Sequence, residues 1–133
     1  MLVEAGECNG FFDLKIFDQQ QTVQLYPEFK QGINEIILDL DLPNTLFFDL
    51  QGKNHDCDTE VDDKGNIIRD KYLKVIEFLV DNKPVKSDKT KQMFILQSEN
   101  NGEIHSSYWG FNGKVELDLT YESALDFHLS NLL

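Results

Sequence analysis

The chain has 133 residues, of which 41% are hydrophobic, enough apolar material for one continuous core in a domain of ordinary size. Its 24 acidic residues outnumber its 12 basic ones and give a formal net charge of −12 at pH 7, which repels phosphate backbones and anionic lipid. We therefore expect one domain over residues 1–133 and exclude nucleic acid and membrane surfaces as partners.

The two cysteines, Cys8 and Cys57, could pair or stay free, because the separation of their Cα atoms decides it. We favour two free thiols. The first residues contain no basic region and no apolar run of a signal peptide, and no stretch approaches the ~20 apolar residues of a transmembrane helix. We expect a protein that is made in a cytoplasm and stays there unless it leaves as part of a larger particle.

Apolar residues recur mainly at every second position, as in Phe12, Leu14 and Ile16, which indicates strands with one buried face. This pattern predicts strands, in chain order, over residues 10–17, 22–26, 33–41, 45–51, 67–81, 93–98, 103–109 and 114–120. Seven or eight such strands fill two packed sheets. The predicted fold class is all-β, an antiparallel two-sheet sandwich.

Turn residues predict how these strands connect. Asn101-Gly102 and Asn112-Gly113 can supply the positive φ angles that tight hairpin turns need. In Asp63-Lys64-Gly65, the glycine can take the left-handed position that closes a bulged turn. The strand before Asp62 should therefore fold back on residues 67–74.

The end of the chain has a different periodicity. After Tyr121, apolar residues return at the spacing of an amphipathic helix, namely at Ala124, Leu125, Leu129 and Leu132. We expect a short C-terminal α-helix over residues 122–132, docked on the sandwich.

The most acidic stretch of the chain is HDCDTEVDD, residues 55–63, followed by Asp70. Alternate carboxylates of an extended segment point one way and present the oxygen ligands that Ca²⁺ prefers. The candidate calcium ligands are Asp56, Asp58, Asp62 and Asp70. No EF-hand is present, because Val61 and Ile67 stand where that loop requires glycine and glutamate. The alternative is a solvated acidic hairpin loop; zinc is disfavoured because Cys8 and Cys57 stand alone.

A second candidate site is the aromatic turn Tyr108-Trp109-Gly110-Phe111-Asn112-Gly113. Aromatic rings can stack on sugar rings while an amide bonds their hydroxyls, and the same residues suit a protein contact. The candidate ligand-binding residues are Tyr108, Trp109, Phe111 and Asn112. In the alternative interpretation, Tyr108 and Phe111 fill the core beneath the turn.

Catalytic groupings are weak in this sequence. His105 with Ser106 or Ser107, and His55 with Cys57, lack a third group that would orient the base. The glycines are not arranged as a phosphate-binding loop. We therefore expect a protein without enzymatic activity and assign no catalytic residue.

The segment DTEVDDKGNIIRDKYLKVIEFLVDNKPV resembles part of the calcium-dependent carbohydrate-binding jelly rolls found beside xylan-degrading enzymes. This resemblance implies a jelly-roll-like sandwich in which Asp56, Asp58, Asp62 and Asp70 hold calcium against sugar hydroxyls. Asp81-Asn82-Lys83 replaces the Asp-Gly or Asn-Gly hairpin of those domains.

The pattern over about residues 46–133, with the aromatic turn near a C-terminal helix, is also similar to uncharacterised β-sandwich proteins of tailed bacteriophages. That resemblance implies a virion subunit of a tail, a fibre or the capsid decoration. The leading expectation is a non-enzymatic virion structural or adhesion subunit that contacts other virion subunits, forms a homo-oligomer and touches carbohydrate. The alternative is a calcium-dependent carbohydrate-binding module.

Overall fold

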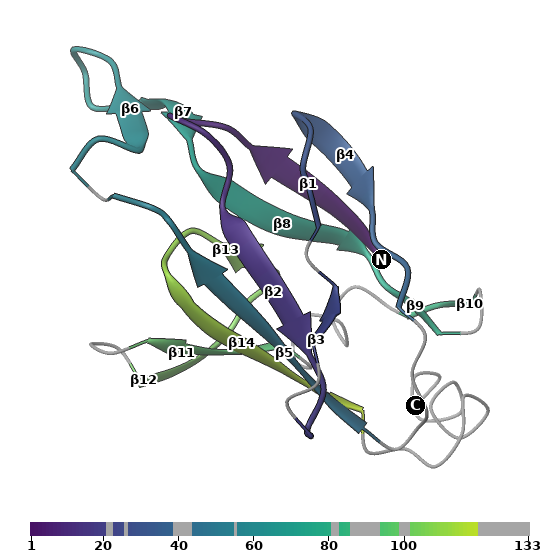
Figure 1. Ribbon diagram of the computed structural model, residues 1–133. Helices are drawn as coiled ribbons and strands as arrows, with labels where there is room; N and C mark the ends of the chain where they lie inside the picture. The colour runs from purple at the N-terminus through teal and green to yellow at the C-terminus, as the bar shows by residue number, and fades with distance from the viewer. Residues whose placement is uncertain are drawn as a thin grey trace.

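The computed structural model describes residues 1–20, 23–25, 27–38, 44–54, 56–80, 83–85, 94–98 and 102–119. Within these residues all regular secondary structure is β-strand, and every strand pairing is antiparallel, which confirms the predicted all-β class (Figure 1). The strands are β1 Leu2–Gly6, β2 Asp13–Phe17, β3 Val23–Leu25, β4 Gly32–Glu35, β5 Asn44–Gln51, β6 Thr59–Val61, β7 Ile67–Asp70, β8 Tyr72–Glu77, β9 Leu79–Val80, β10 Lys83–Pro84, β11 Phe94–Ser98, β12 Gly102–His105, β13 Tyr108–Trp109 and β14 Gly113–Leu119.

Most of these strands belong to two sheets. A six-stranded sheet has the order β12-β11-β14-β5-β2-β3, and a four-stranded sheet has the order β13-β8-β1-β4. Two further pairs, β6-β7 and β9-β10, are hairpins of their own. In Figure 1 the β6-β7 hairpin projects beyond the end of the four-stranded sheet where β1 ends and β8 begins.

The two larger sheets share one hydrophobic core. On β5, Leu46, Phe48 and Leu50 are buried while their neighbours are more exposed, so the period of two predicted for this strand is confirmed. Trp109 of the four-stranded sheet packs on Phe48, with ring centroids 5.3 Å apart, and on Phe94 at 5.2 Å; both belong to the six-stranded sheet. Burying a large apolar side chain contributes about 1.5–3 kcal/mol, so these contacts hold the sheets together.

Two predicted strands are divided in the structure. Residues 67–81 form β7, β8 and β9 up to Val80, because the backbone leaves the strand at Lys71 and again at Phe78. Residues 103–109 contribute to both large sheets, β12 to the six-stranded one and β13 to the four-stranded one. Between them the chain turns at Ser106, whose carbonyl accepts a hydrogen bond from the Trp109 indole at 3.0 Å.

The predicted turns have different outcomes. Gly65 has φ of 83° and closes the β6-β7 hairpin, in which Thr59 pairs with Asp70, as predicted. The prediction for Asn112-Gly113 was wrong, because β13 and β14 lie in different sheets and the turn between them forms no hairpin. Strands β11 and β12 pair as expected, while Asn101 lies outside the described residues.

Strand β1 was not predicted, although it is an interior strand of the four-stranded sheet between β8 and β4. The predicted strand over residues 33–41 is shorter in the structure, ending at Glu35, and residues 39–41 lie outside the described part. The predicted helix over residues 122–132 also lies outside it. Within the described residues, no helix has the length and apolar character needed to cross a membrane.

Candidate functional site

The candidate site is the root of the β6-β7 hairpin, where two lysine ammonium groups are buried. Lys53 Nζ lies 2.7 Å from Asp70 Oδ1 and donates to the Gly110 carbonyl, also at 2.7 Å. Lys71 Nζ lies 3.0 Å from Asp58 Oδ2 and donates to the Gly52 carbonyl at 2.9 Å. Each ammonium thus has one carboxylate and one carbonyl oxygen as partners, so neither charge is buried alone.

Asp70 connects three segments of the chain. Besides Lys53, it accepts hydrogen bonds from the hydroxyls of Thr59 and Tyr108, each at 2.6 Å. Burial raises the pKa of Asp70, but the bonds from Lys53, Thr59 and Tyr108 together outweigh it, so the pKa lies below its ordinary value. For Tyr108, burial and the Asp70 carboxylate both raise the pKa of the phenol. The pair is therefore an ionised carboxylate and a neutral phenol at neutral pH.

Asp58 is the second junction. It accepts hydrogen bonds from the Asn54 backbone N–H at 2.8 Å and from Asn9 Nδ2 at 3.1 Å. The Asn54 bond, followed by those of Lys71 and Asn9, lowers the pKa of Asp58 far below its ordinary value. Asp58 therefore joins the β1-β2 connection to the segment that enters β6.

The four candidate calcium ligands are spread over this region rather than gathered around one point. Asp58 and Asp70 are each neutralised by a different lysine. Asp62 accepts bonds from the backbone N–H groups of Lys64 and Asn66, both at 2.9 Å, and so shapes the hairpin turn. Asp56 has an exposed side chain. In the described residues, no group of three or more His, Cys, Asp or Glu side chains is arranged to hold a metal ion.

The aromatic turn is arranged differently from either interpretation of its sequence. Trp109 is fully buried, so its ring cannot stack on a sugar. Tyr108 and Phe111 are exposed, and Tyr108 stacks on Tyr72 with centroids 5.1 Å apart. Asn112 pairs through both amide atoms with the backbone of Lys53: the Lys53 N–H donates to Oδ1 at 2.9 Å, and Nδ2 donates to the Lys53 carbonyl at 2.8 Å. Asn112 thus positions Lys53, and three of the four candidate ligand-binding residues, Tyr108, Phe111 and Asn112, remain exposed.

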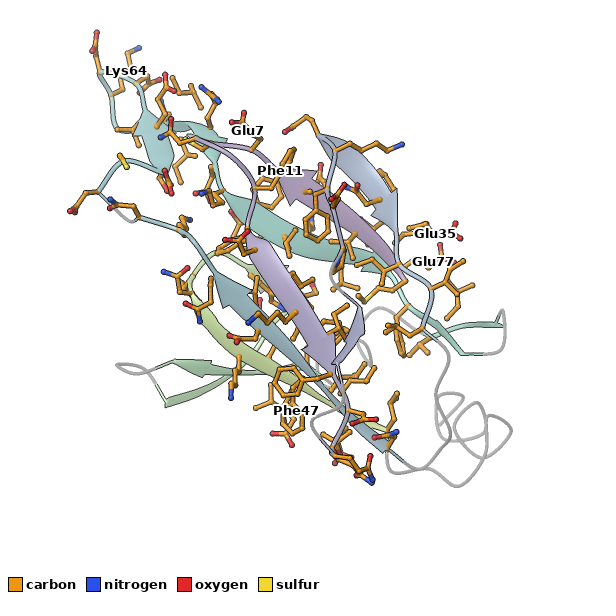
Figure 2. All side chains as sticks on the ribbon, viewed as in Figure 1. Glu7, Phe11, Glu35, Phe47, Lys64 and Glu77 are labelled. Atoms are coloured by element: carbon orange, nitrogen blue, oxygen red, sulfur yellow. The ribbon has the colours of Figure 1, made fainter. Side chains whose placement is uncertain are left out.

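Beyond its root, the hairpin carries exposed apolar side chains. Val61 on β6 pairs with Ile67 on β7, and these side chains are 52% and 63% exposed. Ile68 is 57% exposed. Figure 2 shows the tip of the hairpin, at Lys64, far from both large sheets, and Glu7 near its root. Val61 lies in the acidic stretch of residues 55–63, and Ile67 and Ile68 follow shortly after it. These β-branched residues were a sequence signal for this surface that the sequence-based predictions did not use.

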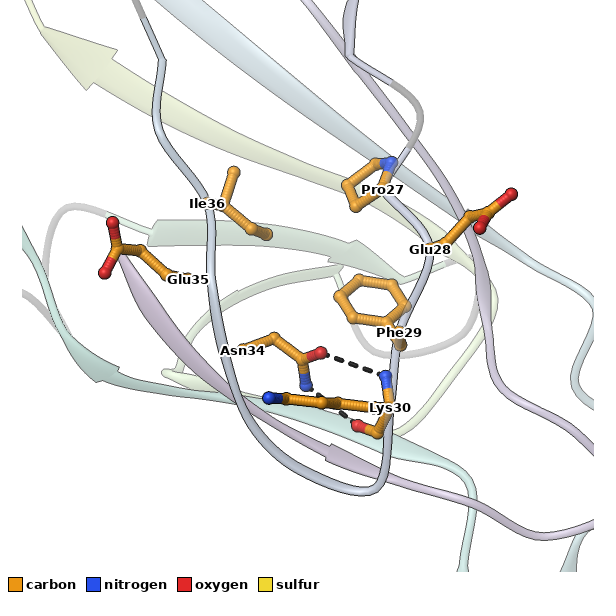
Figure 3. Close-up of a pocket in the computed structure, with 7 residues that line it drawn as sticks. All are labelled: Pro27, Glu28, Phe29, Lys30, Asn34, Glu35 and Ile36. Atoms are coloured by element: carbon orange, nitrogen blue, oxygen red, sulfur yellow. Dashed lines mark hydrogen bonds between the residues drawn. The ribbon is translucent and has the colours of Figure 1, made fainter.

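The root also borders an open hollow of about 350 Å³, lined by Phe11, Ile68, Tyr72 and the Arg69–Glu7 ion pair, in which Arg69 lies 2.7 Å from Glu7. A second hollow lies between residues 27–30 and 34–36 (Figure 3). There the Asn34 side chain exchanges two hydrogen bonds with the backbone of Lys30. Since these bonds bind the loop to itself, we assign no ligand to the second hollow.

The serine considered for catalysis has a structural role. Ser106 Oγ donates to the Tyr108 carbonyl at 3.0 Å and accepts from the Tyr108 N–H at 3.1 Å. The side chain of His105 and residue His55 lie outside the part that the structure describes. Comparison with known proteins gives no matching family model, no matching curated protein and no matching solved structure.

Proposed function

We propose that the protein is a non-enzymatic assembly subunit, a jelly-roll-like β-sandwich whose β6-β7 hairpin binds other protein subunits. The observation that carries this proposal is the exposure of Val61, Ile67 and Ile68 on a hairpin that projects from the sheets. A bacteriophage virion is the particle we propose for it, as a tail, fibre or capsid-decorating component, on the resemblance described above.

A protein strand is the partner that suits this hairpin. In the described residues β6 and β7 pair only with each other, so each has an outer edge of backbone N–H and C=O groups without a ladder partner. Such an edge accepts an added strand, and neighbouring apolar side chains favour a strand that carries apolar residues of its own. A sugar or a metal ion would use neither feature.

The hairpin has a firm base for such a contact. A two-stranded hairpin alone is marginally stable in water. Here Asp70 at the end of β7 is held by Lys53 and Tyr108, and Arg69 reaches Glu7 beyond β1 at 2.7 Å. Because the β6-β7 hairpin is ordered before it binds a partner, binding costs less conformational entropy than it would for a flexible segment.

A second copy of the chain is the partner we propose to test first. The same edge on two copies can pair antiparallel about a twofold axis, because each edge carries both N–H donors and C=O acceptors. The net charge of −12 opposes this contact, and salt screens it, with a Debye length of about 8 Å at 0.15 M. Association is therefore expected in physiological salt and weaker at low salt.

Sedimentation velocity over a series of concentrations tests the proposal. The wild type should form a defined oligomer, and Ile67→Asp should shift it to monomer because a carboxylate in the contact would be desolvated. The matched control is Ile37→Asp: Ile37 is 76% exposed and follows β4 beyond Glu35, which pairs with Leu2 at the opposite end of the sheet. This control should associate like the wild type.

A strict monomer at every concentration, or equal loss in both variants, would contradict assembly through the hairpin. Thermal unfolding with calcium and with a chelator separates the proposal from the calcium-dependent carbohydrate module, because a ligand of the folded state raises the melting temperature. The assembly proposal expects equal melting temperatures. For glycan contact by the adhesion subunit, the informative variant is Phe111→Ala, since Phe111 is exposed whereas Trp109 is buried.

A further inference from the structure

Two loops that are distant in the sequence touch at the root of the hairpin. Cys8 Sγ lies 3.8 Å from the carbonyl oxygen of Cys57, although the residues are 49 positions apart. The next residue, Asn9, donates to the same carbonyl at 2.8 Å. Asn9 has φ of 56° and Gly10 has φ of 101°, a tight reversal that turns the Asn9 side chain toward the neighbouring loop. Figure 1 shows the β1-β2 connection passing the base of β6 and β7.

Both cysteines of the chain are in this contact, and neither is in a disulfide. Cys8 is buried and Cys57 is exposed. The Cys57 thiol donates to Asp58 Oδ1 at 3.5 Å, so its side chain lies on the same junction that Asn9 reaches. The two thiols differ in access, since an oxidant in solution meets Cys57 first.

We propose that Cys8 and Cys57 are a redox pair that forms an intramolecular disulfide with a peroxide-type oxidant and fastens the β1-β2 connection to the root of the hairpin. The cross-link does not depend on the assembly proposed above. It requires the two sulfurs to approach to about 2.0 Å with Cβ atoms about 3.8 Å apart. Because Cys57 is exposed, rotation about its Cα–Cβ bond can bring its sulfur toward Cys8 without moving a packed side chain.

The chemistry takes two balanced steps. The Cys57 thiolate attacks hydrogen peroxide, which forms an S–O bond, breaks the O–O bond and leaves a sulfenic acid and one water after proton transfer. Cys8, as its thiolate, then attacks that sulfur, forming the S–S bond and releasing the oxygen as a second water. Two thiols are oxidised by two electrons, and one peroxide is reduced.

The environment of Cys57 determines the rate at which its thiolate attacks hydrogen peroxide. Partial desolvation, followed by the hydrogen bond and charge of Asp58 and the nearby Asp56 and Cys8, raises the pKa of the Cys57 thiol. Since the thiolate is the nucleophile, the disulfide should form slowly at neutral pH and faster as the pH rises. The Cys8 and Cys57 thiols should therefore stay reduced during brief exposure to peroxide and form the disulfide under sustained oxidation.

The disulfide would stabilise the fold as well as the hairpin root. Linking residues 49 positions apart removes many conformations of the unfolded chain. If the bond forms without strain, the melting temperature should rise by on the order of 10 °C. Treatment with a thiol reductant should restore the original value.

The experiment treats the full chain with hydrogen peroxide under native conditions, followed by intact mass measurement and a tryptic map without reduction. The expected result is a monomer lighter by two hydrogen atoms, with the peptide of residues 1–15 joined to that of residues 54–64. The control is Cys57→Ser, which removes an exposed thiol and should fold like the wild type but show no peroxide-dependent rise in melting temperature.

Three results would overturn the inference. One is oxygen added at Cys57 itself, found on the unjoined peptide of residues 54–64, which would mean that Cys57 oxidises alone. Another is a disulfide dimer on a non-reducing gel, which would mean that the thiols pair between molecules. The third is a joined pair whose melting temperature is no higher than that of the reduced protein, which would mean that the bond strains the native junction.

Discussion

Single residues at the hairpin root show how far the sequence could predict the site. The acidic stretch and Asp70 were visible in the sequence. The compensating groups were not, because Lys53 and Asp70 are 17 positions apart and meet only after the sheets form. Lysine is ordinarily a surface residue, so nothing local marked Lys53 or Lys71 as buried.

At Lys53 we predict that a substitution of similar size lowers the free energy of unfolding strongly. Lys53→Met keeps the apolar stem and removes the ammonium, which leaves Asp70 bonded to Thr59 and Tyr108 but without a counter-charge. Breaking one partner of a buried pair costs about 3–5 kcal/mol. Urea unfolding should show this loss, whereas Lys64→Met at the exposed hairpin tip should change the free energy of unfolding by no more than about 0.5 kcal/mol. Equal effects of the two variants would mean that the Lys53–Asp70 pair contributes nothing.

At the scale of elements, period-two patterns predicted strands wherever one face is buried, as on β5 and β14. They could not divide residues 67–81, because the break falls at Lys71, whose ammonium is buried against the Gly52 carbonyl on another segment. They also missed β1, whose sequence Leu-Val-Glu-Ala-Gly has adjacent apolar residues and no clear alternation. The β6-β7 turn was predictable because its requirement is local: only glycine takes a left-handed φ freely.

A substitution at Gly65 therefore tests the backbone conformation of the β6-β7 turn without adding a side-chain contact. A Cβ at Gly65 would meet nothing within 4 Å, but Gly65 has φ of 83°. Gly65→Ala should destabilise the protein by about 1–2 kcal/mol from backbone strain alone, and Gly65→Asn should cost less because asparagine tolerates this region. Urea unfolding measures both, with Lys64→Ala as the neighbouring control. If alanine and asparagine are equally tolerated, the turn is not held in the left-handed conformation.

For the whole molecule, the excess of acidic residues and the pairing of particular carboxylates have opposite effects as the pH falls. Protonation relieves the repulsion within a chain of net charge −12. It also removes the bonds of Asp58 and Asp70, whose pKa values are lowered in the folded state. A carboxylate of this kind binds its proton more readily in the unfolded chain, so its stabilisation is present above the ordinary pKa of 3.8 and is lost as the pH falls through the lower folded value.

The free energy of unfolding should accordingly decline below a pH of about 4. Asp58→Asn should be less stable at neutral pH and show a shallower decline, since the variant has no carboxylate at that position to protonate. Asp63→Asn, at an exposed position in the hairpin turn, should keep the wild-type profile. Denaturant unfolding at a series of pH values measures all three proteins. A wild-type curve that stays flat into strong acid would mean that relieved repulsion outweighs the lost pairs.

The buried ammonium groups have a further consequence. A dissolved cation between a carboxylate and a carbonyl leaves when its concentration drops below its dissociation constant. Lys53 and Lys71 bring the same positive charge to Asp70 and Asp58 from within the chain. Because each ammonium is covalently linked to the protein, its effective concentration at the carboxylate is fixed and cannot be diluted. The root of the hairpin should therefore keep its order in media of any ionic composition, from a crowded cell interior to fresh water.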